Sequence, residues 1–116
     1  MTAAVGAAPG REIAVMAALV EPSKRAIMQQ LTRGPASASR LAERMPLTRQ
    51  ALVKHLAVLE DAGLVDRSRR GREHVFAARP EVLVGTARWL ESLADSWQRQ
   101  LGALKRAAEA TARELS

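Results

Sequence analysis

The sequence predicts a mainly α-helical protein with a small β-hairpin, and three patterns along the chain carry this prediction. Before residue 62, apolar residues recur at the three- and four-residue spacing of amphipathic helices. Residues 64–78 contain two short extended runs around a glycine, which is typical of a hairpin. From Glu81 to Arg113, one apolar stripe indicates a single long helix. Residues 1–10 lack periodicity and are expected to form a disordered tail.

Two short helices are expected directly after this tail. The first spans residues 12–20, and the apolar residues sharing one of its faces are Ile13, Met16, Ala17 and Val20. The second begins at Pro22, because proline suits the first position of a helix, and ends near residues 33–34. Its inward residues are expected to be Ile27, Met28 and Leu31.

A third short helix is expected from Ser37 to Met45, with Ser37 as its N-cap and Leu41 buried. Pro46 interrupts the helical pattern, and Thr48 is suited to cap the next helix. About four residues therefore separate two short helices. This spacing is typical of a helix-turn-helix unit.

The helix expected after Thr48 is the most informative element of the chain. Leu52, Leu56 and Leu59 are spaced to share one buried face, and Gly63 can adopt the left-handed conformation that ends a helix. The residues left outside in its first two turns are Arg49, Gln50, Val53 and Lys54. Basic and amide side chains at the start of a helix suit contacts with base edges in a DNA major groove.

A hairpin is expected next, with strands at residues 64–68 and 74–78 and a connection at residues 69–73. Val65 and Phe76 are its expected inward residues. Its basic residues are Arg67, Arg69, Arg70 and Arg72. A solvated hairpin would account for them, but an arginine-tipped hairpin also fits a narrow minor groove, where the negative potential is enhanced. We favour the second interpretation.

The last helix carries a longer apolar stripe than so small a domain can cover. The stripe consists of Leu83, Thr86, Leu90, Leu93, Trp97, Leu101, Leu104 and Ala108. We therefore expect a second copy of the chain to cover it, so that the protein dimerises through its first and last helices. The expected interface residues are Ile13, Leu90, Leu93, Trp97, Leu101 and Leu104. For Trp89 and Trp97 the dimer core is favoured over the lining of an effector pocket.

Composition agrees with a nucleic-acid partner. A chain of 116 residues is expected to form one domain, and its net charge of +6 favours a polyanionic partner. No apolar run is long enough to span a bilayer, and no secretory leader is recognisable, so no membrane partner is expected. The absence of cysteine excludes disulfides and thiolate metal sites, and it fits a cytoplasmic location.

Three segments of the chain carry a family resemblance: LVEPSKRAIMQQL at residues 19–31, SRLAERM at residues 39–45, and LVKHLAVLEDAGLVDRSRRGREHVF at residues 52–76. Together they resemble the ArsR-type family of bacterial transcriptional repressors. The WLESLADSW run at residues 89–97 is similar to the last helix of one subgroup. The resemblance implies a winged helix-turn-helix domain, placed here at residues 11–80, and a dimerisation helix at residues 81–116. It also implies a homodimer that binds a palindromic double-stranded operator, represses nearby genes and releases DNA when an effector binds.

The sequence departs from the family pattern at three points. Met45 and Pro46 replace the usual turn glycine, and Val53 stands where the family usually has a polar residue. Valine there could pack on a thymine methyl group or could simply flank the helix, and both interpretations stay open. Many members of the family sense metals through cysteines near the recognition helix or through acidic and histidine residues on the last helix. Here residues 81–116 contain no histidine and the chain contains no cysteine, so metal sensing is not expected of this protein. No metal or cofactor is expected, and an effector, if one exists, would be a small apolar molecule or a partner protein.

Individual side chains suggest separate roles at DNA. Gln50 suits adenine and Arg49 suits guanine, because each can form two hydrogen bonds to those base edges, whereas Lys54 lies a turn further on and suits phosphate. Thr48 is expected both to cap its helix and to touch DNA. His55 is interpreted as a packing or phosphate-contacting residue. Lys24 and Arg25 oppose a helix dipole, and a nearby phosphate would remove that penalty.

Two other functional classes fit the sequence less well than a DNA-binding regulator. A winged-helix module that binds protein would be expected to lack a basic hairpin, which this sequence keeps. An enzyme would need a catalytic constellation, but His55 and His74 fall on different elements and no phosphate-binding glycine loop is present. We therefore expect no enzymatic activity.

Overall fold

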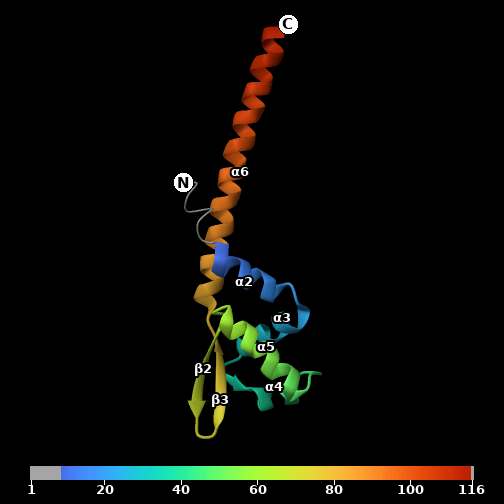
Figure 1. Cartoon of the computed structure of the whole chain (residues 1–116), viewed down its shortest axis with the longest axis vertical. Helices are drawn as coiled ribbons and strands as arrows, with labels where there is room; N and C mark the ends of the chain where they lie inside the picture. The colour runs from blue at the N-terminus through green and yellow to red at the C-terminus, as the bar shows by residue number, and fades with distance from the viewer. Residues whose placement is uncertain (1–8, 116) are drawn as a thin grey trace.

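A computed structural model describes residues 9–115, and Figure 1 shows a small helical domain from which one long helix extends. The helices are α2 (Pro9–Leu19), α3 (Pro22–Leu31), α4 (Ala38–Arg44), α5 (Arg49–Asp61) and α6 (Pro80–Leu115). The strands are β1 (Ala36–Ser37), β2 (Val65–Arg70) and β3 (Glu73–Ala78). The predicted class, mainly helical with a small β-hairpin in a winged helix-turn-helix arrangement, is confirmed, and a third short strand joins the hairpin.

The core lies where α2, α3, α4 and α5 meet the base of the sheet. Its fully buried side chains include Val15, Ile27, Leu41, Leu52, Leu56, Leu59, Leu64 and Val65. The three leucines of α5 are buried together because their spacing places them on one face of the helix. This face holds α5 on the domain and leaves its opposite face in solvent.

The helix-turn-helix unit begins and ends as its capping residues predict. The Ser37 Oγ accepts a hydrogen bond from the Arg40 N–H at 3.1 Å, and the Thr48 Oγ1 accepts one from the Ala51 N–H at 3.0 Å. Each bond satisfies an N–H that has no partner within its helix. Gly63 has a φ of +81°, the left-handed conformation expected after α5.

The hairpin belongs to a three-stranded sheet with the order β1-β3-β2. The strand β1 was not predicted, because two residues are too few to show an alternating pattern; Ala36 pairs with Phe76. The expected five-residue connection is wrong. Arg70 pairs with Glu73, so Gly71, with a φ of +62°, and Arg72 make the turn alone. Val65 and Phe76 are buried, as predicted.

The first helix differs from its prediction in start and orientation. It begins at Pro9, inside the segment expected to be a disordered tail; residues 1–8 of that segment lie outside the described residues. Its buried residues are Val15 and Ala18, whereas Ile13 and Val20 are 54% and 71% exposed. Periodicity identified the helix, but its packing against α3, α5 and α6 selected a different face.

The helix α6 has 36 residues, which corresponds to a length of about 54 Å. Among the residues that the structure describes, its start packs on the domain, and Val82 and Thr86 are buried there. Figure 1 shows the remainder extending away from the domain, with the C-terminus at one end of the molecule and the hairpin near the other. Trp97, Leu101 and Leu104 are between 60% and 67% exposed. In the described range 9–115, no helix is long and apolar enough to cross a membrane.

Candidate nucleic-acid interface

The N-terminal end of α5 presents four side chains to solvent: Arg49, Gln50, Val53 and Lys54. Their spacing divides them into two pairs, each separated by one helical turn. Arg49 and Val53 line a cleft that also includes residues of the hairpin. Gln50 and Lys54 lie on the side of α5 away from its buried leucines.

The cleft between α5 and the hairpin has a volume of about 280 Å³. One wall is formed by Arg49 and Val53, and the other includes Arg67, Arg72 and His74. Residues 37–39 at the start of α4 also contribute to it, and the Arg49 Nε donates a hydrogen bond to the Ser39 Oγ at 3.1 Å. The two basic elements singled out from the sequence therefore border one concave surface.

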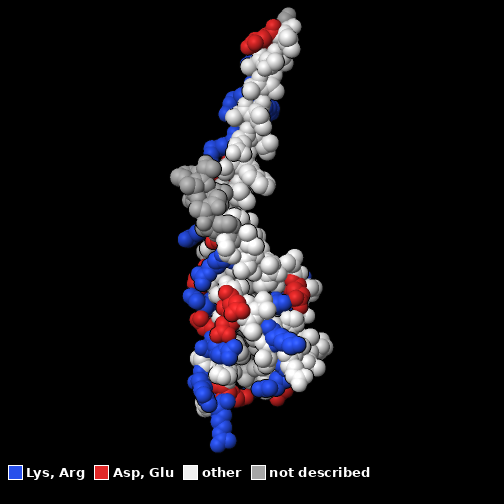
Figure 2. All heavy atoms as spheres, viewed as in Figure 1, with Lys and Arg blue, Asp and Glu red and all other residues white. Residues whose placement is uncertain are grey.

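The hairpin arginines lie in different environments. The Arg67 guanidinium carbon lies 5.3 Å from the Phe76 ring centroid, and its Nη2 donates to the Glu60 Oε1 at 2.8 Å. Arg67 thus fastens the base of the hairpin to α5. Arg69, Arg70 and Arg72 surround the turn and are exposed. Figure 2 shows lysine and arginine side chains gathered at the hairpin end of the molecule.

Two basic residues of α4 were missed by the sequence analysis. Arg40 and Arg44 line a second hollow, of about 310 Å³, together with Arg70 and Glu73 of the hairpin. Their spacing of four residues on a short helix was a usable signal. The first helix of a helix-turn-helix unit crosses the DNA backbone, so this position suits phosphate contacts.

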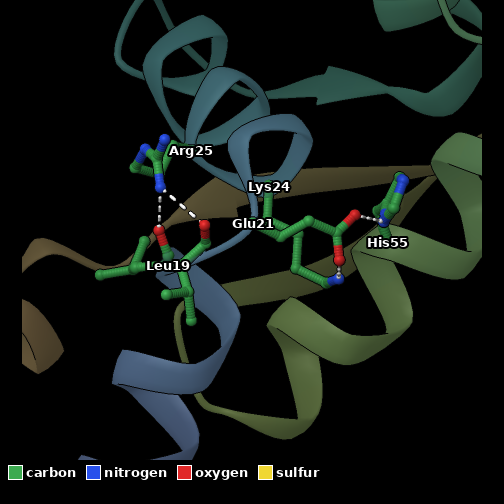
Figure 3. A network of polar contacts seen from close by, with 6 residues as sticks. Leu19, Glu21, Lys24, Arg25 and His55 are labelled. Carbon is green, nitrogen blue, oxygen red and sulfur yellow. Dashed lines mark hydrogen bonds and ion pairs between the residues drawn. The ribbon is translucent and has the colours of Figure 1, made fainter.

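The expectation that Lys24 faces DNA is wrong. Lys24 is only 8% exposed, and its Nζ forms an ion pair with the Glu21 Oε2 at 2.6 Å. The His55 Nδ1 lies 3.5 Å from the other oxygen of the same carboxylate, so Glu21 links α3 to α5 (Figure 3). The hydrogen bond from Lys24, followed by the charges of Lys24 and His55, lowers the pKa of Glu21 below its usual value. This carboxylate supplies the negative charge that the N-terminus of α3 favours.

Arg25 is exposed but has partners within the chain. Its Nη1 donates hydrogen bonds to the Leu19 and Val20 carbonyl oxygens at 2.6 and 2.9 Å (Figure 3). These carbonyls end α2, where a cation is favoured by the helix dipole. Arg25 therefore stabilises the junction between α2 and α3, and its contact with DNA stays a prediction. His55 is half-buried beside Glu21, which agrees with a packing role.

The residues expected at the dimer interface are mostly exposed in the single chain. Ile13 of α2 and Leu90, Trp97, Leu101 and Leu104 of α6 are all at least 42% exposed, and Leu93 is half-buried.

Within residues 9–115 no group of three or more histidine, cysteine, aspartate or glutamate residues is arranged to hold a metal ion.

The chain is similar in sequence to known helix-turn-helix proteins. A family model described as a helix-turn-helix domain matches residues 19–68. The uncharacterized HTH-type transcriptional regulator YuzN of Bacillus subtilis is 36% identical over 90 residues, covering 71% of this chain and 98% of its own. The HTH-type transcriptional regulator Rv2034 of Mycobacterium tuberculosis is 34% identical over 84 residues, covering 72% of this chain and 76% of its own.

A solved structure extends the similarity to the fold. An ArsR-like transcriptional regulator from Rhodococcus sp. RHA1 has a TM-score of 0.78 and 41% identity, and the match covers 84% of this chain and 92% of that one. Sequence similarity, the helix-turn-helix unit and the basic hairpin thus lead to one assignment. The chain belongs to the ArsR family of winged helix-turn-helix, DNA-binding transcriptional regulators.

Proposed function

We propose that the protein is a homodimeric repressor that binds a palindromic DNA operator. The observation that carries the proposal is the cleft between α5 and the hairpin, where Arg49 and Val53 oppose Arg67 and Arg72. A recognition helix in the major groove and a basic hairpin in the neighbouring minor groove would occupy such a surface together. In a bacterial cell this function places the protein in the cytoplasm.

The exposed residues of α5 divide between sequence recognition and backbone binding. Arg49 and Gln50 lie in its first turn and have the geometry for two hydrogen bonds each to guanine and adenine. Val53 lies one turn after Arg49 and is positioned to contact a thymine methyl group. Thr48 uses an oxygen lone pair for capping, so its hydroxyl proton is still available to DNA. Lys54, Arg40 and Arg44 are assigned to phosphates.

The dimer follows from the apolar surface that one chain leaves uncovered. Leu90, Trp97, Leu101 and Leu104 lie along one face of α6 and are largely exposed. Pairing about a two-fold axis would bury this face against its own copy. It would also present two α5 helices to successive major grooves about 34–36 Å apart, which matches a palindromic site.

Replacing Arg49 or Gln50 by alanine is expected to relax sequence specificity. Each variant should lose roughly 1–3 kcal/mol of binding free energy on the operator and much less on random DNA, because only base contacts distinguish the two. Lys54→Ala should weaken binding to both DNAs alike, since phosphates are the same in every sequence. Fluorescence anisotropy on the upstream region of the gene and on a scrambled duplex measures both affinities.

Gln98→Ala is a matched control, because Gln98 is an exposed amide on α6 and does not line the cleft between α5 and the hairpin. It should leave both affinities unchanged. Equal losses on operator and random DNA for Arg49→Ala and Gln50→Ala would contradict the assigned roles. Absence of any preference for the upstream region in the unaltered protein would favour the alternative, a winged-helix module that binds protein.

Metal ions are not expected to regulate operator binding. This prediction rests on the absence of cysteine from the sequence and of histidine from residues 81–116, which leaves few donors for zinc, nickel or cobalt. Operator affinity measured with each ion at micromolar concentration should equal the affinity measured with a chelator. A stoichiometric ion that changed the affinity tenfold would contradict the prediction.

A further inference from the structure

An apolar recess of about 520 Å³ lies where the end of α3 meets the junction between β3 and α6. Its buried residues are Met28 and Leu31, and half-buried Ala77, Ala78 and Leu83 form its sides. Pro35 and Pro80 stand at its exposed edge. This volume lies within the range of about 300–1,000 Å³ that is usual for small-molecule sites. None of these residues lines the cleft between α5 and the hairpin.

The lining defines the chemistry that the recess can accept. Among the described residues that form it, none carries a formal charge, and the polar side chains are Gln29 and Thr32. The Thr32 hydroxyl donates to the Gln29 carbonyl oxygen at 2.6 Å, so its oxygen remains an acceptor for another donor. An ionised ligand would lose hydration there without a countercharge. The recess therefore suits an uncharged, largely apolar molecule with one or two polar atoms.

A second copy of the chain is a poorer occupant than a small molecule. Of the lining residues described, Leu83 alone belongs to the apolar stripe of α6. The exposed large residues of that stripe begin at Leu90, about 10 Å further along the helix. Pairing of two α6 helices along Leu90–Leu104 would cover a convex surface and would leave this recess unfilled.

The recess touches the connection between the DNA-binding elements and α6. Met28 and Leu31 belong to the same core cluster as Leu56 and Leu59 of α5. On the other side, Ala78 and Pro80 flank Arg79, whose N–H donates to the Leu64 carbonyl oxygen at 2.8 Å and whose Nε donates to Glu81 at 2.9 Å. The Glu81 main-chain hydrogen bond and the Arg79 guanidinium lower the pKa of Glu81. A molecule bound between these walls would change the position of α6 relative to α5.

We propose that this recess binds a small, uncharged, largely apolar organic molecule, and that its occupation lowers operator affinity. The second part rests on the proposed function; the first does not. Because the two α5 helices of a dimer must match the spacing of successive major grooves, a small change at the base of α6 alters their fit. The coupling arises because the ligand and the operator favour different positions of α6.

The binding site is tested without DNA, using the uncharged fluorescent probe N-phenyl-1-naphthylamine. The unaltered protein should bind it saturably at one molecule per chain. Ala77→Phe places a ring in the recess and should weaken binding at least tenfold. Ala103→Phe adds the same ring at an exposed position of α6 outside the recess and should bind as the unaltered protein does. Circular dichroism and thermal midpoints verify that each variant is folded.

A second variant keeps the test decisive if Ala77→Phe fails to fold. Thr32 is exposed at the recess, so Thr32→Trp can cover it without disturbing the core, and it should also weaken probe binding at least tenfold. Absence of saturable binding, or equal binding by Thr32→Trp and the unaltered protein, would overturn the site.

Saturating probe should then weaken operator binding by about 5–150-fold in the unaltered protein and not in the recess variants. Probe binding without any change in operator affinity would overturn the regulatory part alone. A protein that bound no operator would contradict the proposed function, whereas the probe titration would still decide the site.

Discussion

Raising the salt concentration from 50 to 200 mM is expected to weaken operator binding by about 10³–10⁵-fold. The exposed arginines of the hairpin, together with Arg40, Arg44 and Lys54, give a dimer enough cations to neutralise about 6–10 phosphates. Each neutralised phosphate releases condensed counterions, and added salt opposes that release. Anisotropy titrations at several salt concentrations measure the slope of log affinity against log salt.

Variants of the hairpin arginines measure how much of this salt dependence comes from the hairpin. Replacing Arg69 and Arg72 by alanine should reduce it by about one for each phosphate contact that is lost, counted in both chains of the dimer. Arg113→Ala removes one positive charge per chain from the far end of α6 and should leave the slope unchanged. A nearly flat dependence on the best operator would contradict phosphate binding by this surface.

Replacing Trp97 by alanine is expected to weaken the dimer by roughly 3–5 kcal/mol if the ring is fully buried between the two chains, and by less at the edge of the interface. That loss corresponds to a dissociation constant about 10²–10⁴-fold higher. The ring is 60% exposed in the single chain, so its loss should leave the fold of each chain unaltered. Sedimentation equilibrium of the unaltered and altered proteins measures the dissociation constant.

Operator affinity should fall with the dimer, although Trp97 belongs to α6, which extends away from the domain (Figure 1). Gln98 is the next residue but lies off the apolar stripe, so Gln98→Ala should change neither the dissociation constant of the dimer nor the operator affinity. Circular dichroism of Trp97→Ala should retain the helical signal of the unaltered protein. An unaltered protein that is monomeric at micromolar concentration and still binds a palindrome tightly would contradict the proposed assembly.

The features that the sequence predicted correctly are those that neighbouring residues determine. Ser37 and Thr48 cap the helices that follow them through hydrogen bonds to the third residue along the chain. Leu52, Leu56 and Leu59 share a face because of helix geometry alone, and Gly63 supplies the left-handed backbone that ends α5. The placement of basic residues on α5 and the hairpin followed from these local rules.

Features that depend on contacts between distant segments were missed or wrongly oriented. The strand β1 exists because Ala36 pairs with Phe76, forty positions later in the chain. A two-residue strand has no sequence pattern from which that partner could be predicted. Lys24 is buried where α3 approaches α5, and the carboxylate that compensates its charge, Glu21, also lies 3.5 Å from the Nδ1 of His55 on α5. In α2, packing against three other helices selected Val15 and Ala18 over Ile13.

The sequence by itself therefore determined the helices, their caps, the hairpin and the family. The tertiary structure decided the surroundings of the hairpin arginines, all of which are exposed. Arg67 contacts Phe76 and Glu60, and the Arg69 Nε donates to the Gly71 carbonyl oxygen. It also decided that an apolar recess lies beside α6, because its walls come from α3, β3 and α6. Caps and periodicity act over a few residues, but burial and cavities arise only when distant segments pack together.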